Sequence, residues 1–156
     1  MAETEGVDVM RTAQEMLDYC IENGLGYRTK DAPIVYIEFF DVIAKYLMPH
    51  ENVLLAFSGG LRDATFGTPR SFLREYAFAL TGQRLLIGAK ALLLGGEFFY
   101  EAPLSNLASV NMRVSNAAVF VLFDMIMEQF KVNVWDVDIA NRIIHECDKI
   151  IDIYAS

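Results

Sequence analysis

The chain has 156 residues, 54% of them hydrophobic, and its 13 Lys and Arg residues against 21 Asp and Glu residues give a formal net charge of −8. A chain of this length is expected to fold as one domain with a short appendage, and to bury most of its apolar surface without a disulfide or a structural metal ion. The acidic excess argues against a broad nucleic-acid-binding surface, because such a surface needs Lys and Arg side chains to replace the counterions of phosphates. It also argues against adsorption to an anionic membrane.

The segment 9–22 has the spacing of an amphipathic helix. Its apolar residues recur every three or four positions, with charged and amide residues between them. Gly24 and Gly26 follow, and glycine adopts the left-handed backbone that commonly ends a helix. The pattern therefore predicts a first helix over 9–22, with an apolar face formed by Met10, Ala13, Leu17, Cys20 and Ile21.

A second helix is predicted from Pro33 to Leu47, because proline is favoured in the first turn of a helix. Its charged residues, Glu38, Asp41 and Lys45, form one narrow stripe, and nearly every other residue is apolar. Such a helix must be buried on several sides. Two arrangements meet this need: the helix is buried within one chain, or it contacts a second copy. In the second arrangement the interface residues would be Tyr36, Phe39, Phe40, Ile43 and Leu47.

From residue 49 onwards the spacing of apolar residues changes from helical to alternating, which is typical of β-strands. Short turns that contain glycine separate the alternating runs, for example at Thr81-Gly82-Gln83. Seven strands are predicted, near residues 53–57, 76–80, 85–89, 98–100, 108–112, 119–123 and 130–134.

The chain is predicted to end on an amphipathic helix. Asp136 or Asp138 can cap its first turn, because a carboxylate there accepts hydrogen bonds from free backbone N–H groups. Its apolar face is formed by Ile139, Ile143, Ile144, Cys147, Ile150, Ile151 and Tyr154. The predicted fold class is therefore α+β: a seven-stranded, bent antiparallel sheet or partly open barrel with a C-terminal capping helix, preceded by two N-terminal helices. Residues 1–48 would form a helical appendage and residues 49–156 the sheet domain.

Three segments and one longer stretch carry a family resemblance. The segments are ENVLLAFSGG at 51–60, YAFALTGQRLLIG at 76–88 and APLSNLASVNM at 102–112, and the stretch is FFDVIAKYLMPHENVLLAF at 39–57. They resemble the lead-in helix, first strand, hairpin and later strand of the bacterial pleckstrin-homology-like (PH-like) domains, the YokE-like group in particular. The resemblance covers about residues 39–154, and it implies a PH-like barrel and a scaffold role. Its motifs are structural, so it implies no catalytic residue.

The chain contains no arrangement of residues that is typical of an active site. Ser58 lacks the glycine two positions earlier that a nucleophile elbow requires, and Gly60 and Gly67 are wrongly spaced for a phosphate-binding loop. His50 and His145 are isolated in the sequence, so each is expected to be solvent-facing or satisfied by neighbours and not a ligand or base, and His145 is expected to be exposed. An enzyme would need a pocket with convergent polar groups. We therefore expect no enzyme and no cofactor, and no catalytic, cofactor-binding or metal-ligating residue is predicted.

The two cysteines and the N-terminal residues indicate in which cellular compartment the protein is expected. Cys20 and Cys147 lie near opposite ends of the chain, with no C-x-x-C or Cys/His cluster, so two buried thiols are expected rather than a disulfide or a zinc site. The N-terminal residues contain no basic segment followed by an apolar stretch, and no run approaches the ~18 apolar residues that a membrane-spanning helix needs. A cytoplasmic protein is therefore expected.

One connection between predicted strands is a candidate binding site. Residues 61–74 are long for a hairpin connection and hold three of the 13 basic residues. In eukaryotic PH domains the corresponding loop resembles a phosphoinositide cradle of closely spaced basic residues, whereas here Asp63 lies among the arginines and no lysine adjoins them. The segment is therefore either an exposed loop whose arginines keep it soluble or a ligand or partner site. The residues of that site would be Arg62, Phe66, Arg70, Phe72 and Arg74.

These observations predict a non-enzymatic interaction or oligomerisation module that self-associates or binds a protein partner through the second helix and exposed strand edges. The alternative is a module that binds an anionic headgroup or a phosphopeptide through Arg62, Arg70 and Arg74. Nucleic acid is not expected as a partner, and membrane lipid is disfavoured. Residues 1–50 hold 9 acidic and 4 basic residues, and residues 51–156 hold 12 and 9. The acidity is therefore concentrated in the predicted helical appendage.

Overall fold

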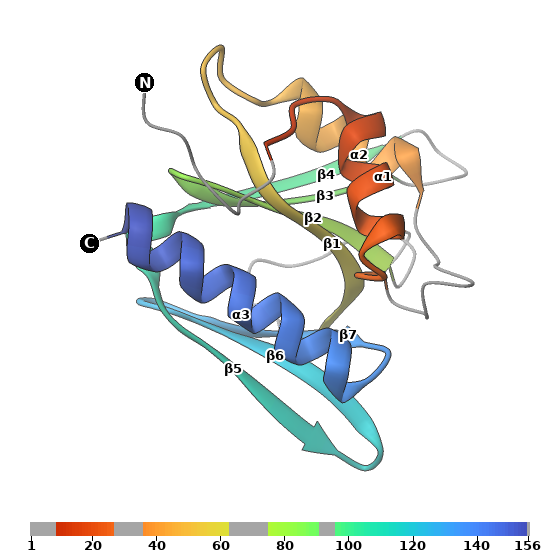
Figure 1. Ribbon diagram of the computed structural model, residues 1–156, viewed down its shortest axis with the longest axis vertical. Coiled ribbons are helices and arrows are strands. Elements are labelled where there is room, and N and C mark those ends of the chain that lie inside the picture. The colour runs from red at the N-terminus through yellow and green to blue at the C-terminus, as the bar shows by residue number, and fades with distance from the viewer. Residues whose placement is uncertain (1–8, 27–35, 63–74, 91–95, 156) are drawn as a thin grey trace.

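The computed structural model describes residues 9–26, 36–62, 75–90 and 96–155 (Figure 1). The elements in chain order are α1 (Ala13–Glu22), α2 (Ile37–Lys45), β1 (Val53–Arg62), β2 (Glu75–Thr81), β3 (Arg84–Lys90), β4 (Glu97–Pro103), the short 3-10 helix η1 (Leu104–Asn106), β5 (Leu107–Ser115), β6 (Ala118–Met125), β7 (Gln129–Val134) and α3 (Val137–Tyr154). The predicted α+β class is confirmed, with a seven-stranded antiparallel sheet and a C-terminal helix. The strand order is β4-β3-β2-β1-β7-β6-β5. The sheet is not closed into a barrel, because no strand pairing in the described part of the chain joins β4 to β5.

β1 belongs to both halves of the bent sheet. It pairs with β2 from Val53 to Gly60 and with β7 only from Gly60 to Arg62. Gly59 lies at this crossing, and a Cβ atom there would come within 2.8 Å of the Asn133 carbonyl oxygen. A glycine is therefore needed where β7 approaches β1. We call β1 to β4 the first half of the sheet and β5 to β7 the second half.

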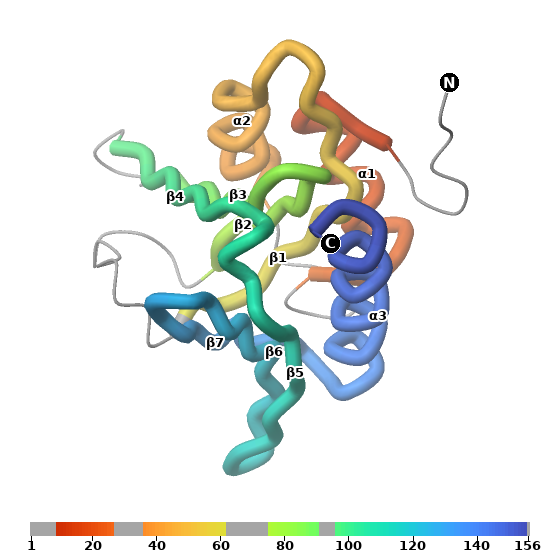
Figure 2. The backbone as a smooth tube through the Cα atoms, turned by 90° about the vertical axis from the view of Figure 1, so that its left-hand side faces the viewer, coloured from red at the N-terminus to blue at the C-terminus, as the bar shows by residue number. Residues whose placement is uncertain are grey.

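A row of stacked aromatic rings joins the two halves in the core. Phe57 of β1 stacks on Phe78 of β2 at 5.0 Å between ring centroids and on Phe123 of β6 at 6.2 Å. Phe123 in turn stacks on Phe130 of β7 at 5.4 Å. All four rings are fully buried. Both views place α3 alongside the two halves (Figures 1 and 2), and its residues Ile139, Ile143, Cys147 and Ile150 complete the same core.

Helix α2 packs against the first half of the sheet. The sheet accepts the helix closely because Gly88 of β3 has no side chain: a Cβ atom there would lie 2.8 Å from the Phe39 carbonyl oxygen and 3.0 Å from Ile43 Cγ1. Phe39, Phe40 and Ile43 are buried within the chain. Tyr36 and Leu47, the other two residues of the predicted interface, are partly buried against the same core.

The burial of α2 corresponds to one of the two arrangements that the sequence left open, burial within one chain. The sheet covers the helix, with the help of α1. Phe39, Phe40 and Ile43 are therefore not accessible to a partner while α2 stays on the sheet. The buried residues of both N-terminal helices also belong to one cluster with those of the strands, so the two helices and the sheet share a core.

The helix ends follow from local capping. Thr12 caps α1: its side chain accepts a hydrogen bond from the Glu15 backbone N–H, and the Glu15 carboxylate accepts one from the Thr12 N–H. This capping box explains why α1 begins at residue 13 and not at residue 9. Of the two predicted caps for α3, Asp136 is used, and its side chain accepts from the Ile139 N–H at 2.9 Å.

Candidate functional site

The predicted arginine-containing site falls almost entirely on residues 63–74. Phe66, Arg70, Phe72 and Arg74 therefore lie outside the described residues. Arg62 is the last residue of β1, where its backbone is paired with that of Lys131 in β7. The structure thus places one member of the predicted site at the junction of the two sheet halves.

The isolated histidines and cysteines do not gather into a site. His50 lies in the connection between α2 and β1, His145 lies on α3, and both are exposed. Cys20 and Cys147 are free and buried. Burial raises the pKa of the Cys20 thiol to about 12 and also raises the pKa of Cys147, so both thiols stay protonated and unreactive at neutral pH. Within the described residues, no group of three His, Cys, Asp or Glu side chains could hold a metal ion.

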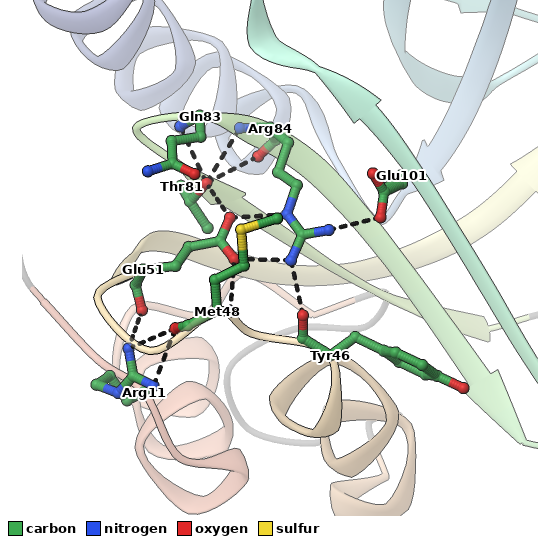
Figure 3. A network of polar contacts seen from close by, with 8 residues as sticks. All are labelled: Arg11, Tyr46, Met48, Glu51, Thr81, Gln83, Arg84 and Glu101. Atoms are coloured by element: carbon green, nitrogen blue, oxygen red, sulfur yellow. Dashed lines mark hydrogen bonds and ion pairs between the residues drawn. The ribbon is translucent and has the colours of Figure 1, made fainter.

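A buried ion pair lies at the junction of α2, β1 and the β2–β3 hairpin (Figure 3). The Arg84 guanidinium donates to both oxygens of Glu51, from Nε to Oε2 at 2.8 Å and from Nη2 to Oε1 at 2.7 Å. Arg84 also donates to the Tyr46 carbonyl oxygen at 2.7 Å and to Glu101 Oε2 at 2.6 Å. The Thr81 hydroxyl donates to Glu51 Oε2 at 2.9 Å. One arginine therefore connects the end of α2, the connection before β1, and β4.

The electrostatics of this pair are those of a structural site. Burial alone would raise the pKa of Glu51, but hydrogen bonds from Arg84, the Met48 N–H and Thr81 outweigh it and hold that pKa below its usual value. Both carboxylate oxygens are occupied by these donors. Glu51 thus has no free lone pair pointing at a substrate. Arg11 adds to the network by donating to the backbone carbonyls of Met48 and Glu51.

A cleft of about 490 Å³ opens beside the ion pair. It is lined by Val9, His50, Glu51, Asn52, Leu54, Gly82, Gln83 and Tyr154. Tyr154 packs so closely on the β2–β3 turn that a Cβ atom at Gly82 would lie 2.8 Å from its ring. His50, Asn52, Gln83 and Tyr154 of the lining are exposed, and the one carboxylate, that of Glu51, is paired with Arg84.

Among the described residues, helix α3 packs on one face of the second half of the sheet, and no helix covers the other face (Figure 1). Residues of β6 alternate strictly between buried and partly exposed positions, as in a strand with one face on the core and one towards solvent. The residues of β6 that point away from the core would normally be polar, yet here they include Phe120 and Leu122. Trp135, just after β7, is 50% exposed. We call this surface the open face, and it consists of Arg113, Phe120, Leu122, Lys131, Asn133 and Trp135.

Basic and amide side chains surround Phe120 on the open face. The strand register places Arg113 of β5 on one side of Phe120 and Asn133 of β7 on the other. Lys131 is paired with Leu122, and its Nζ lies 5.5 Å from the centroid of the Phe120 ring, within the range of a cation–π interaction. Aromatic residues and arginine are enriched at protein interfaces. The arrangement suits contact with a partner that offers both apolar and acidic groups.

Sequence reasoning missed the open face although its signal is in the sequence. The alternation over 119–123 was recognised, but the residues between the predicted core positions, Phe120 and Leu122, are themselves apolar. A strand with apolar residues in both rows is either buried on both faces or exposes an apolar row. The choice between these depends on which sheet face the helices cover, and that is a tertiary property.

The tip of the β6–β7 hairpin is a second exposed apolar feature. Ile126 and Met127 are 66% and 90% exposed. They lie beside Glu128, whose carboxylate accepts a hydrogen bond from the Tyr100 hydroxyl. Two strongly exposed apolar side chains therefore lie outside the open face, on the turn after β6.

Comparison with known proteins adds no function. No protein-family model matches the chain, and no curated protein matches it. The resemblance to PH-like domains therefore stays a prediction. Among the described residues, no helix is long and apolar enough to cross a membrane.

Proposed function

We propose that the protein is a non-enzymatic interaction module of the PH-like type that acts in the cytoplasm by self-association, and that the open face makes the contact. The observation that carries the proposal is the apolar solvent row of β6, with Trp135 beside it. Phe120, Leu122 and Trp135 lie on a sheet face that would be polar in a strand adapted only to water. This assignment moves the predicted interface from α2 to the second half of the sheet.

The energetic argument is the removal of these side chains from water. A Phe or Trp side chain buries about 150–250 Å² when it is covered, and each Å² of apolar surface contributes roughly 25 cal/mol. Trp135 is 50% exposed and Phe120 and Leu122 are already partly buried, so only the part of each side chain that is still exposed contributes, a few kcal/mol at most before the cost of association is subtracted. We expect association that is reversible and depends on concentration.

Light scattering over a range of protein concentrations tests the proposal. The wild-type mass should rise above the 17.6 kDa of one chain as the concentration increases. A Phe120→Ser/Trp135→Ser variant should stay at the mass of one chain, because it removes the aromatic part of the open face and leaves the core untouched. Met127→Ser removes a more exposed apolar side chain elsewhere and should behave like the wild type.

Two results would contradict the proposal. One is a wild-type protein that stays monomeric at every concentration. The other is a Phe120→Ser/Trp135→Ser variant that associates as strongly as the wild type while its circular dichroism shows that it is folded.

A second candidate function is binding of an anionic headgroup or phosphopeptide through Arg62, Arg70 and Arg74. The observation that favours it is the backbone register of β1 and β7, in which Arg62 is paired with another basic residue, Lys131, at the start of the arginine-containing segment. Binding of a phosphotyrosine peptide and of vesicles containing a phosphoinositide should then be lost when all three arginines are changed to alanine. Equal binding by the wild type and this variant would remove the candidate.

A further inference from the structure

Helix α1 carries an acidic surface, and two of its charges, those of Asp18 and Glu22, are not placed where they would stabilise the helix. Glu15, Asp18 and Glu22 are spaced by three and four residues and are all exposed, so they lie on one side of the helix. Asp18 and Glu22 form an i, i+4 pair of like charges, which disfavours a helix. Glu22 is also the last residue of α1, where the helix dipole favours cations, and the last turn contains no basic residue.

The acids find little compensation within the chain. Glu15 is used in the capping box with Thr12, and Asp18 accepts one hydrogen bond from the neutral Gln14 amide at 2.8 Å. In the part of the chain that the structure describes, no Lys or Arg forms an ion pair with Asp18 or Glu22. Arg142 of α3 donates to the carbonyl oxygen of Asn23 at this end of α1, so a cation lies near the helix terminus, but within the described residues it forms its ion pair with Asp138 and not with Asp18 or Glu22.

A groove and two apolar residues accompany the acids. A groove of about 280 Å³ is lined by Val9, Met10, Glu15, Asp18, Tyr19 and Glu22. Tyr19 is partly exposed beside it, and Ile21 is exposed on the same helix. We call the surface formed by Glu15, Asp18, Tyr19, Ile21 and Glu22 the acidic face. It combines negative charge with apolar area, which is the chemical complement of the open face.

We propose that the acidic face of one copy of this chain binds the open face of a second copy, in a head-to-tail arrangement. The inference rests on the proposed self-association and names the surface on the second copy. Arg113 is exposed, and no hydrogen bond or ion pair joins it to another residue in the described ranges. It would meet Asp18 and Glu22, while Phe120 and Trp135 would cover Tyr19 and Ile21.

The position of the two faces determines the kind of assembly. In both views α1 lies beside β1 and away from β5 and β6 (Figures 1 and 2). Each copy therefore presents one acidic face and one open face in different places. Contact between two different surfaces is heterologous, and it continues from copy to copy until a ring closes or an open chain forms. A two-fold dimer through a single shared patch would not use both faces.

A mixing experiment tests this arrangement. Arg113→Glu reverses the charge of the open face and leaves the acidic face intact. Asp18→Lys/Glu22→Lys reverses the acidic face and leaves the open face intact, and it also improves the charge pattern of α1, so the variant should fold. Each variant alone should have a dissociation constant raised about tenfold or more and should remain monomeric where the wild type associates. Mixed in equal amounts, the two variants should associate again, because each supplies the intact face that the other lacks and the reversed charges of the two altered faces also attract each other.

The outcomes separate the two proposals. A mixture that stays monomeric, although the wild type associates and Phe120→Ser/Trp135→Ser does not, would overturn the head-to-tail pairing and leave the open face as the contact. A monomeric wild type would overturn both. The control is Asp148→Lys/Asp152→Lys, which makes the same change of charge, also at two exposed residues four positions apart, on α3. If this variant weakens association as much as Asp18→Lys/Glu22→Lys does, net charge and not the acidic face is responsible, and the head-to-tail pairing is wrong.

Discussion

Arg84 binds Glu51 through two hydrogen bonds, and the two side chains are only 7% and 1% exposed. The pair connects the segment before β1 to the β2–β3 hairpin, with Tyr46 and Glu101 as further partners of the arginine. A buried pair that is satisfied in this way contributes little net stability, but removal of one partner leaves an uncompensated charge. The pair therefore sets where the end of α2 meets the sheet.

Glu51→Ala should lower the free energy of unfolding by about 3–5 kcal/mol, because it leaves the Arg84 guanidinium buried without its main counterion. Urea unfolding followed by circular dichroism measures the change. Glu101→Ala is the matched control, because the Glu101 side chain is 52% exposed and an exposed pair contributes at most about 1 kcal/mol. Equal losses in the two variants would contradict the role given to the buried pair.

The same carboxylate predicts a pH dependence. The pKa of Glu51 is lowered in the folded protein, so the unfolded state binds its proton more readily. Its contribution to stability is thus fully present above the unfolded pKa and is lost as the pH falls through the lower folded pKa. The difference in unfolding free energy between wild type and Glu51→Gln should therefore shrink as the pH falls below about 4.5. A difference that stays constant down to strongly acidic pH would show that the carboxylate charge is not responsible.

Gly88→Ala should destabilise the protein by about 1–3 kcal/mol, because its Cβ atom would lie 2.8 Å from the Phe39 carbonyl oxygen and α2 would have to move outward. Thermal unfolding measures the effect. Gly96→Ala has nothing within 4 Å of the new atom and should be nearly neutral. If both substitutions are neutral, α2 does not pack on β3 as closely as described.

Ala117→Gly should stabilise the protein by about 1 kcal/mol. Ala117 has φ of 67° in the turn between β5 and β6, where Asn116 also has a positive φ of 50°, and glycine adopts this backbone without steric cost. Ala108→Gly, at an exposed position of β5, should instead destabilise by about 0.5–1 kcal/mol. A melting temperature that falls in both variants would contradict the strain assigned to Ala117.

The strands and the last helix could be predicted because the apolar residues of each recur with one clear spacing. In β2, Tyr76, Phe78 and Leu80 alternate with small residues, and in α3 the apolar residues follow helical spacing. The end of β1 could not be predicted from such a pattern. Gly59 and Gly60 resemble a strand end because glycine is a weak strand former, but β1 continues through them, and Gly59 is required where β7 crosses β1.

The packing of α2 and the exposed surface of the sheet were less predictable from the sequence, because both depend on which helix covers which face of the sheet. The composition of α2 indicated burial but not the sheet as the partner, since the space for the helix is created by Gly88, far along the chain. Glu51 and Arg84 are separated by 33 residues, and no local pattern connects them. The open face required knowledge that β6 is covered on only one side.

Fluorescence quenching of Trp135 is the measurement that tests the open face most directly. Trp135 is the single tryptophan of the chain and lies half exposed on that face, so a soluble quencher such as acrylamide reports on this surface alone. We predict that the quenching constant falls as the wild-type concentration rises from the low to the high micromolar range, and that it stays high in Asp18→Lys/Glu22→Lys. Quenching that does not change with concentration while the mass of the particle increases would show that the chain associates through another surface.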